Sequence, residues 1–259
     1  MTEKELIIGG CKVRYVEQCS DASTVVYVFL HGWGSDYTIF KSLFGVVDCL
    51  LAFDFPGFGG SSPLREPWTL AAYAAVLREF VEKKAGGRKV VFVAHSFGGR
   101  VLLHMLSQQS TLDWIQRIIC MGVPFARKQK ATSSFMAPIL GVAKVIVRLL
   151  PRSMRQRIRA WWCDFIGAED YAVLESVAMK KTFQHVIATD MRYLAQSLRG
   201  YDTVFLWGAD DVAAPIADAA VVAQEVGATL HRIAGGDHFP FLGATSEAFE
   251  TAFTQHACL

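Results

Sequence analysis

The feature that most constrains the fold is a series of short apolar runs, rich in β-branched residues, that alternate with helical patterns. From Val25 onward the runs are nearly continuous, as in strands that are buried on both faces of a parallel sheet. Eight runs stand out, at residues 6–8, 13–16, 25–30, 46–53, 90–94, 115–121, 204–207 and 229–233. Helical patterns follow several of them, at residues 69–84, 98–109, 216–226 and 246–256. The alternation predicts an α/β fold, with a mostly parallel, eight-stranded sheet and helices on both faces.

One segment interrupts this alternation. Residues 124–200 contain no clear strand and have the pattern of several helices, at 134–150, 153–166, 171–179 and 183–198. The segment is too long for a single crossover between neighbouring strands. We therefore expect residues 1–123 and 201–259 to form a core domain. Residues 124–200 are expected to form a helical cap over the carboxyl edge of the sheet, where the parallel strands end.

The predicted cap is strongly basic. Residues 127–159 contain nine arginines and lysines and no acid, although the whole chain has a net charge of only +2. Three interpretations stay open: the bases are a solvated outer face, they touch anionic lipid or a lipid-like substrate, or they recognise an anionic substrate such as a carboxylate or acyl-CoA. Trp161 and Trp162 follow directly and are candidates for lining an acyl pocket.

Length and composition limit the other possibilities. The 259 residues suit one large domain, or one domain with an insertion, and the 52% hydrophobic content excludes a disordered chain. The small net charge and the lack of a basic, aromatic stripe indicate no nucleic-acid partner. The longest apolar stretch, residues 135–147, is too short to span a bilayer, so we expect no stable membrane insertion. The sequence leaves the oligomeric state open.

Cysteine and histidine usage adds two expectations. The six cysteines are scattered without a C-x-x-C pair, and the N-terminal MTEKELIIGG lacks the apolar centre of a signal peptide. Together these features predict a reduced, cytoplasmic chain without a disulfide framework. The seven histidines show no H-E-x-x-H or comparable spacing, so we expect no metal and no cofactor.

The strand predicted at residues 90–94 ends in His95-Ser96, and a helical pattern begins two residues later. Ligands of open α/β sheets bind beyond such strand ends. A serine hydroxyl is exposed on so tight a turn only if small residues stand two positions before and after it, here Ala94 and Gly98. The stretch fits the nucleophile-elbow pattern G-x-S-x-G with alanine for the first glycine. Ser96 is the candidate nucleophile; the alternative is an ordinary strand–turn–helix junction.

A second motif, His-Gly-Trp-Gly at residues 31–34, directly follows the strand predicted at 25–30. A glycine-flanked turn there can expose a backbone N–H, and the helix after Ser96 offers others at its N-terminus. The backbone N–H groups of Trp33 and Phe97 are therefore the candidate donors of an oxyanion hole. We expect the His31 side chain to be a structural hydrogen-bonding group.

Two further strand ends carry an acid and a histidine. Asp210 and Asp211 follow one strand in Leu-Trp-Gly-Ala-Asp-Asp, and His238 follows the next in Gly-Gly-Asp-His. A carboxylate can orient an imidazole, and the imidazole can accept the proton of a serine. The chain order Ser, Asp, His matches one known order of such triads. The residue types leave open which aspartate serves, or whether both are solvated loop acids.

Together with DFPGFGGS at residues 54–61, these motifs resemble the α/β-hydrolase superfamily over nearly the whole chain. The resemblance favours Asp211 as the acid, because the acid in such families often follows a glycine by three residues and precedes a proline by four, here Gly208 and Pro215. It implies Ser96 as nucleophile and His238 as base. The cap segment is similar to the cap of small bacterial hydrolases of uncertain substrate.

The resemblance implies a carboxylesterase-like serine hydrolase acting on a small to medium ester or acyl substrate. His95 and Phe239, beside the predicted triad, are further pocket candidates. Two enzyme alternatives share the fold: a lyase resembling menaquinone-pathway synthases, which act on an anionic substrate, and a carbon–carbon bond hydrolase. Arg100, just after the elbow glycines, keeps an anion site open, although we expect a structural ion pair there. A non-catalytic ligand receptor is the remaining alternative.

Overall fold

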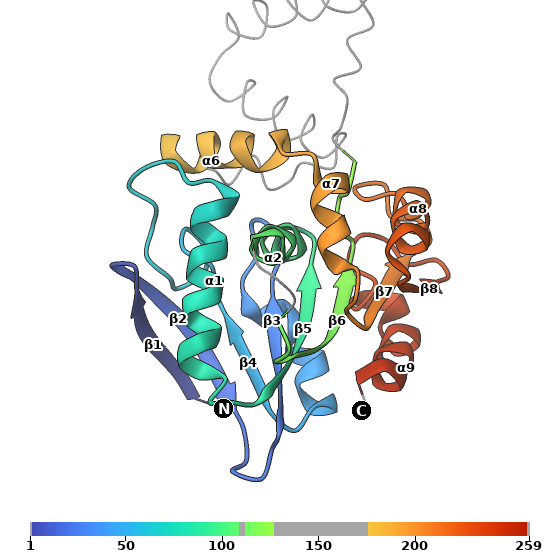
Figure 1. The fold of residues 1–259 in the computed structure, drawn as a ribbon, viewed down its shortest axis with the longest axis horizontal. Helices are drawn as coiled ribbons and strands as arrows, with labels where there is room; N and C mark the ends of the chain where they lie inside the picture. Colours follow the sequence, from blue (N-terminus) through green and yellow to red (C-terminus); the bar gives the residue numbers. More distant parts are fainter. Residues whose placement is uncertain (1, 109–111, 127–175, 258–259) are drawn as a thin grey trace, which may run out of the picture.

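The computed structural model describes residues 2–108, 112–126 and 176–257, and within these residues eight strands form one sheet (Figure 1). The order across the sheet is β1-β2-β4-β3-β5-β6-β7-β8. β2 pairs antiparallel with β1 and with β4, and all other neighbours are parallel. The strands are β1 (Thr2–Ile8), β2 (Cys11–Gln18), β3 (Val25–Leu30), β4 (Leu50–Phe53), β5 (Lys89–His95), β6 (Ile115–Met121), β7 (Thr203–Gly208) and β8 (Thr229–Ile233). The predicted eight-stranded, mostly parallel sheet is confirmed.

The nearly continuous apolar runs arise because the sheet is covered on both faces. In β3, Val28 belongs to one hydrophobic cluster and Phe29 to a second cluster on the opposite face. The first cluster includes residues of α1 (Leu70–Lys84), α2 (Phe97–Ser107), α6 (Val177–Ala188), α7 (Met191–Ala195), the short 3₁₀ turn η2 (Gln196–Leu198) and α8 (Ile216–Val226). The second includes residues of the 3₁₀ helix η1 (Tyr37–Val46) and of α9 (Ser246–Ala257), which the short turn η3 (Gly243–Thr245) precedes. No helix in the described ranges combines the length and apolarity needed to cross a bilayer.

Two elements differ from their predicted extent. The strand expected at 46–53 begins only at Leu50, because η1 occupies the chain up to Val46 after Asp36 caps it by accepting from the Thr38 N–H at 2.8 Å. The single helix expected at 183–198 is broken between α6 and α7. Asp190 is extended and caps α7 by accepting from the Arg192 N–H at 2.9 Å, so a new helix starts there. The helices predicted at 134–150 and 153–166 lie outside the described residues, as does most of the one at 171–179.

The carboxyl ends of four strands meet at one edge of the sheet. Leu30 of β3 pairs with Ala94 of β5, His95 of β5 pairs with Met121 of β6, and Gly208 ends β7. In Figure 1, α6 lies above α1 and α2, on the side toward which β5 and β6 point. Beside α2, α7 packs between that helix and α8. The loops that follow these strand ends therefore share one edge, which α6 borders.

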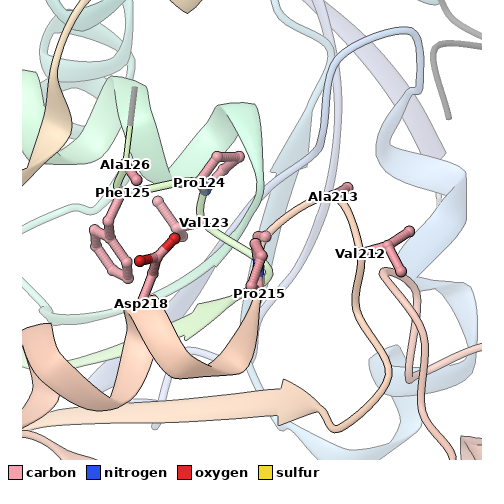
Figure 2. A pocket seen from close by; sticks show the side chains of 9 residues that line it. Val123, Pro124, Phe125, Ala126, Val212, Ala213, Pro215 and Asp218 are labelled. Atoms are coloured by element: carbon pink, nitrogen blue, oxygen red, sulfur yellow. The ribbon is translucent and has the colours of Figure 1, made fainter. Parts of the chain in front are cut away.

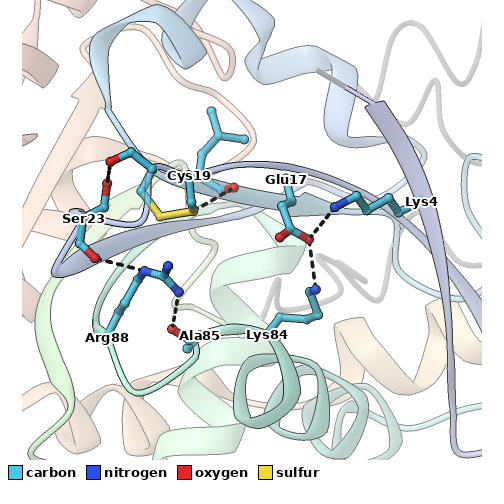
Figure 3. Close-up of a disulfide and its surroundings, with 10 residues drawn as sticks. Lys4, Glu17, Cys19, Ser23, Lys84, Ala85 and Arg88 are labelled. Atoms are coloured by element: carbon cyan, nitrogen blue, oxygen red, sulfur yellow. Dashed lines mark hydrogen bonds and ion pairs between the residues drawn. A yellow bond between two sulfur atoms is a disulfide. The ribbon is translucent and has the colours of Figure 1, made fainter.

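A disulfide between Cys19 and Cys49 corrects the prediction of a chain without disulfides (Figure 3). Gln18 of β2 pairs with Leu50 of β4, so the two cysteines are the next opposed pair along the same antiparallel ladder. Cys11 and Cys120 are free thiols. Because disulfides persist in oxidising compartments and are rare in the cytosol, the cysteine pattern no longer supports a cytoplasmic setting.

Candidate active site

Ser96 lies on the turn between β5 and α2 and has φ 49° and ψ −110°. Among the described residues it is the one non-glycine residue with a positive φ, a conformation that costs about 1–3 kcal/mol. Its N–H donates to the Met121 carbonyl at 2.8 Å, which ties the turn to β6. A Cβ added to Gly98 would lie 2.4 Å from the Leu30 carbonyl oxygen, so no larger residue fits there. The sequence-predicted tight turn is present, and the neighbouring strands hold it.

Ser96, His238 and Asp211 form a continuous hydrogen-bonded chain. His238 Nε2 lies 3.0 Å from Ser96 Oγ, and His238 Nδ1 lies 2.8 Å from Asp211 Oδ2. With its Nδ1–H donated to the carboxylate, the neutral imidazole presents the Nε2 lone pair to the serine hydroxyl. The three predicted side chains therefore meet, although they come from loops after β5, β7 and β8.

Asp211 is held as an acceptor by its own loop. Its Oδ1 accepts from the N–H groups of Ala213 and Ala214, both at 2.8 Å, and its side chain is nearly fully buried. Asp210, in contrast, is exposed and uses its N–H to bond the Gly236 carbonyl. The choice of Asp211 over Asp210 thus agrees with the geometry.

Two glycines that the sequence analysis did not single out as close contacts make this meeting possible. Gly122, directly after β6, has φ +56°, and a Cβ there would lie 3.0 Å from the His238 ring and 3.3 Å from Asp211 Oδ2. A Cβ at Gly208 would lie 2.0 Å from the Asp237 carbonyl oxygen. The one available signal was their position immediately at a strand end.

The His-Gly-Trp-Gly loop runs beside the nucleophile. A Cβ added at Gly32 would lie 3.5 Å from Ser96 Cβ, which places the backbone of Trp33 next to the serine. Phe97 is the first residue of α2, so its N–H has no partner within the helix. The His31 side chain is buried, donates from Nδ1 to the Gly32 carbonyl at 2.7 Å and accepts from the Phe55 N–H at 3.0 Å. The structural role predicted for His31 is confirmed.

The loop that contains the DFPGFGGS motif, residues 54–61, supports the candidate oxyanion loop. Asp54 is fully buried and accepts from the Arg14 Nε at 2.6 Å and from the N–H groups of Tyr37 and Gly60 at 2.9 Å each. Phe58, from the same loop, packs edge-on against Trp33 with ring centroids 4.9 Å apart. The buried carboxylate therefore fixes the loop on which the Trp33 ring rests.

His95 takes a different place from the one predicted. Instead of lining an open pocket, its ring is fully buried, and its Nε2 donates to the His238 carbonyl at 2.9 Å. The rings of His95 and His238 lie 4.9 Å apart, and Phe239 packs on both. Burial lowers the pKa of His95 well below its ordinary value, and the neighbouring His238 lowers it further. His95 is thus a neutral support for the His238 loop, and Phe239 is half-buried beside it.

Arg100 also differs from expectation. It forms no ion pair within the described part of the chain, and its guanidinium instead donates to the carbonyls of Pro124, Val186 and Thr189 at 2.6–2.8 Å. The predicted structural ion pair is wrong, because backbone carbonyls take the place of a carboxylate at both terminal nitrogens, while the buried Nε has no hydrogen-bond partner in the described residues. Trp161, Trp162 and the basic stretch 127–159 lie outside the described residues.

An apolar cavity of about 170 Å³ is lined by the residues that follow Gly122 and Asp211 in the sequence (Figure 2). One wall is the chain after Gly122, namely Val123, Pro124, Phe125 and Ala126, and the other is the chain after Asp211, from Val212 to Pro215. Asp218 of α8 contributes the charged group. In the described residues no group of three or more His, Cys, Asp or Glu side chains has the arrangement of a metal site.

Comparison with curated proteins finds partial matches. A Mycoplasma pneumoniae protein named provisionally as an esterase/lipase is 36% identical over 80 residues, which is 29% of this chain and 30% of the relative. The dihydrolipoyllysine-residue acetyltransferase component of the acetoin cleaving system of Cupriavidus necator is 32% identical over 119 residues, 45% of this chain and 30% of the relative. The matched parts thus span under a third of the length of either relative.

Solved structures match over nearly the whole chain. A bromoperoxidase from Bacillus anthracis has a TM-score of 0.72 at 18% identity and covers 99% of both chains. An esterase from Exiguobacterium antarcticum has a TM-score of 0.70 at 17% identity, covering 96% of this chain and 97% of the esterase. At such identities the likeness concerns the fold. The sequence model of the alpha/beta hydrolase family matches residues 27–252, a range that includes Ser96, Asp211 and His238. The chain belongs to the alpha/beta hydrolase family.

Proposed function

We propose that the protein is a serine hydrolase that cleaves carboxylic esters of small to medium size through an acyl-enzyme. The observation that carries the proposal is the position of His238, within hydrogen-bond distance of both Ser96 Oγ and Asp211 Oδ2. This is the geometry in which an imidazole removes a serine proton while a carboxylate fixes its tautomer. The family membership and the esterase named among the structural neighbours support the same reaction class.

The reaction follows from these groups in two stages. His238 Nε2 takes the Ser96 proton as Oγ bonds to the acyl carbon, and the Trp33 and Phe97 N–H groups stabilise the oxyanion. The ester C–O bond then breaks, and the imidazolium gives its proton to the leaving alcohol. In the second stage His238 deprotonates a water that attacks the acyl-enzyme, and the proton returns to Ser96 Oγ as the acid leaves.

The apolar cavity beyond Gly122 and Asp211 supports a short or medium acyl chain as the substrate group. Its volume of about 170 Å³ resembles that of the dry cavities of about 150 Å³ that hold a benzene-sized ligand. Asp218 on its wall disfavours a carboxylate in the same place. Arg100 is buried and bonded to three carbonyls through both terminal nitrogens, which leaves only its Nε without a partner among the described residues and weighs against the lyase that would act on an anionic substrate.

The position of α6 supports an additional proposal, that residues 124–200 act as a cap over this edge. Phe183 of α6 packs on the Trp33 ring with centroids 5.1 Å apart, and Thr182 accepts from the Trp68 N–H at 2.8 Å. The α6 helix thus borders the candidate oxyanion loop.

The test is turnover of p-nitrophenyl acetate, butyrate, hexanoate and octanoate by the wild-type protein and by Ser96→Ala. We expect Ser96-dependent hydrolysis, with kcat falling by about 10⁴–10⁶ in the variant. Labelling of Ser96 by a fluorophosphonate without ester turnover would overturn the esterase proposal in favour of the lyase or carbon–carbon hydrolase. Absence of both fluorophosphonate labelling and ester turnover would favour a non-catalytic ligand receptor.

The cavity has its own test. Ala126→Leu should narrow it and shift the preferred ester from butyrate or hexanoate toward acetate. The matched control is Ala22→Leu, at a groove near the disulfide, which should leave the chain-length profile unchanged. An unchanged profile in Ala126→Leu would remove the cavity from the substrate site while leaving the esterase proposal in place.

A further inference from the structure

Arg100 is a buried cation with no role in the triad. It lies four residues after Ser96 in α2 and is 5% exposed. The charge of Asp190 favours the protonated guanidinium, although the two side chains form no ion pair in the described ranges. Burial lowers the pKa of its guanidinium to about 10, so the side chain stays charged at neutral pH. A buried charge without a carboxylate partner is costly, and such a group persists where hydrogen bonds compensate it.

The compensating carbonyls come from two separate segments. Nη1 donates to the Pro124 carbonyl at 2.8 Å, in the chain that leaves β6. Nη2 donates to the carbonyls of Val186 at 2.6 Å and Thr189 at 2.7 Å, at the end of α6. Carbonyls at a helix C-terminus lack partners within the helix, and a cation there is favourable. The planar guanidinium reaches all three oxygens at once through donors fixed in a fork, a geometry that the single ammonium of a lysine does not reproduce.

The segment held by these bonds borders the candidate oxyanion loop. The α6 helix presents Phe183 to the ring of Trp33 and Thr182 to the Trp68 N–H. A Cβ added at Gly57 would lie 2.7 Å from the Met179 sulfur, so α6 also rests on the loop after β4. Movement of α6 would therefore be transmitted to the loop that carries the Trp33 N–H.

We propose that Arg100 is a positioning residue that ties the chain at Pro124 and the end of α6 to α2, the helix that follows Ser96, and so fixes α6 against Trp33. Its effect on turnover rests on the proposed function, because Trp33 matters to the rate only if its N–H stabilises an oxyanion. Its effect on α6 does not depend on that function. The two consequences can be measured separately.

Arg88 provides a matched control. Its Nε donates to the Ser23 carbonyl at 3.0 Å and its Nη1 to the Ala85 carbonyl at 3.2 Å, at the opposite edge of the sheet (Figure 3). Both arginines therefore bond backbone carbonyls from two segments, and one of them lies beside α6. Arg100→Ala and Arg88→Ala should both lower the melting temperature, while the consequences for α6 and for turnover should follow Arg100 alone.

The experiment measures hydrogen exchange of peptides from α6 and ester turnover in Arg100→Ala, Arg100→Lys and Arg88→Ala. In Arg100→Ala we expect faster exchange in α6 and a kcat about tenfold lower with little change in KM, less than the loss of an oxyanion donor would cost. Added guanidinium ion at millimolar concentration should restore both, whereas sodium chloride at the same ionic strength should not. Arg100→Lys, which keeps the charge and loses the fork, should lie between.

Wild-type exchange of α6 in Arg100→Ala would overturn the proposal, as would changes of equal size in Arg88→Ala. If Arg100→Ala does not fold, Arg100→Lys decides, since wild-type exchange and turnover in that variant would show that the fork is not needed. If the wild-type protein hydrolyses no ester, the proposed function fails while the exchange result still tests the tie to α6.

Discussion

The two edges of the sheet are built in different ways. At the carboxyl edge, glycines allow backbone and side chains to approach so closely that Cβ atoms at Gly122 and Gly208 would collide with the His238 loop. His31, Asp54 and Asp211 are buried there, and the side chain of each is fixed in direction by hydrogen bonds to backbone groups. This edge also contains the strained backbone of Ser96.

The amino edge is held by ion pairs between exposed or half-exposed side chains, by backbone hydrogen bonds of Arg88, and by a disulfide whose Cys49 is buried. Glu17 pairs with Lys4 at 3.3 Å and with Lys84 at 2.9 Å, the Cys19–Cys49 disulfide joins β2 to the start of β4, and Arg88 binds two carbonyls (Figure 3). Exposed ion pairs are worth little individually, so the disulfide is the strongest of these links. An open groove of about 610 Å³ adjoins it, lined largely by small and polar residues.

From this difference we expect turnover and the free energy of unfolding to depend on different edges of the sheet. Changes at the carboxyl edge are expected to alter turnover, because they move groups that must keep sub-ångström geometry. Changes at the amino edge are expected to alter the free energy of unfolding with turnover intact. Comparing variants at the two edges, or variants at similar positions within one edge, tests this expectation.

The largest expected effect on turnover, after loss of Ser96, is that of Asp211→Asn. Without the carboxylate the imidazole of His238 adopts the wrong tautomer, and kcat should fall by about 10⁴. Asp210→Asn, one residue earlier and exposed, should keep kcat within about threefold. Steady-state kinetics on p-nitrophenyl butyrate measures both, and an equal loss in the two variants would contradict the assignment of Asp211.

A smaller effect is expected from Gly122→Ala. An added methyl would meet the His238 ring at 3.0 Å, and displacing the imidazole should lower kcat about 10- to 100-fold. Gly200→Ala is the control, because Gly200 also has a positive φ, +87°, but has open space around it. Both variants should lose about 1–2 kcal/mol of stability through the left-handed backbone. Equal kcat losses would show that the backbone strain, and not contact with His238, is responsible.

Much of this fold was predictable, because a strand that is buried on both faces of a sheet appears in the sequence as a nearly continuous apolar run. The strands from β3 onward could be placed because their apolar runs are nearly continuous, and the strand ends then located Ser96, Asp211 and His238. Parallel strands bring their carboxyl ends to one edge, so residues far apart in the sequence could be expected to meet.

The features that were missed depend on information that periodicity does not contain. The disulfide follows from the register in which Gln18 faces Leu50, and nothing in the separate apolar runs sets that register. The break at Asp190 is a local capping contact inside a helical pattern. The roles of His95 and Arg100 depend on which carbonyls surround them, and those carbonyls come from segments distant in the sequence.

A third prediction concerns pH. The unfolded His95 titrates near its ordinary pKa of about 6.5, while burial and the nearby His238 and His31 lower the pKa in the folded protein. The unfolded state therefore binds more protons, so stability present above about pH 6.5 should be lost as pH falls, by up to about 1.4 kcal/mol per pH unit for this residue. His95→Gln, whose amide can still donate to the His238 carbonyl, should flatten urea-measured stability between pH 7 and pH 5 and lower kcat only a few-fold. A slope equal to that of the wild-type protein would assign the loss to other groups, such as His31.

The smallest effect on turnover is expected from the amino edge. Reduction of Cys19–Cys49, or the variant Cys19→Ser with Cys49→Ser, should lower the free energy of unfolding by about 2–4 kcal/mol and leave kcat unchanged below the melting transition. Thermal unfolding with and without a phosphine reductant, beside the ester assay, measures both quantities. Cys11→Ser is the control, because Cys11 is a free thiol at the start of β2, the strand that ends just before Cys19, and its variant should respond to the reductant as the wild-type protein does. If reduction lowered kcat while α9 and the sheet stayed folded, the two edges would be coupled. The disulfide would then contradict the expectation that changes at the amino edge alter the free energy of unfolding without altering turnover.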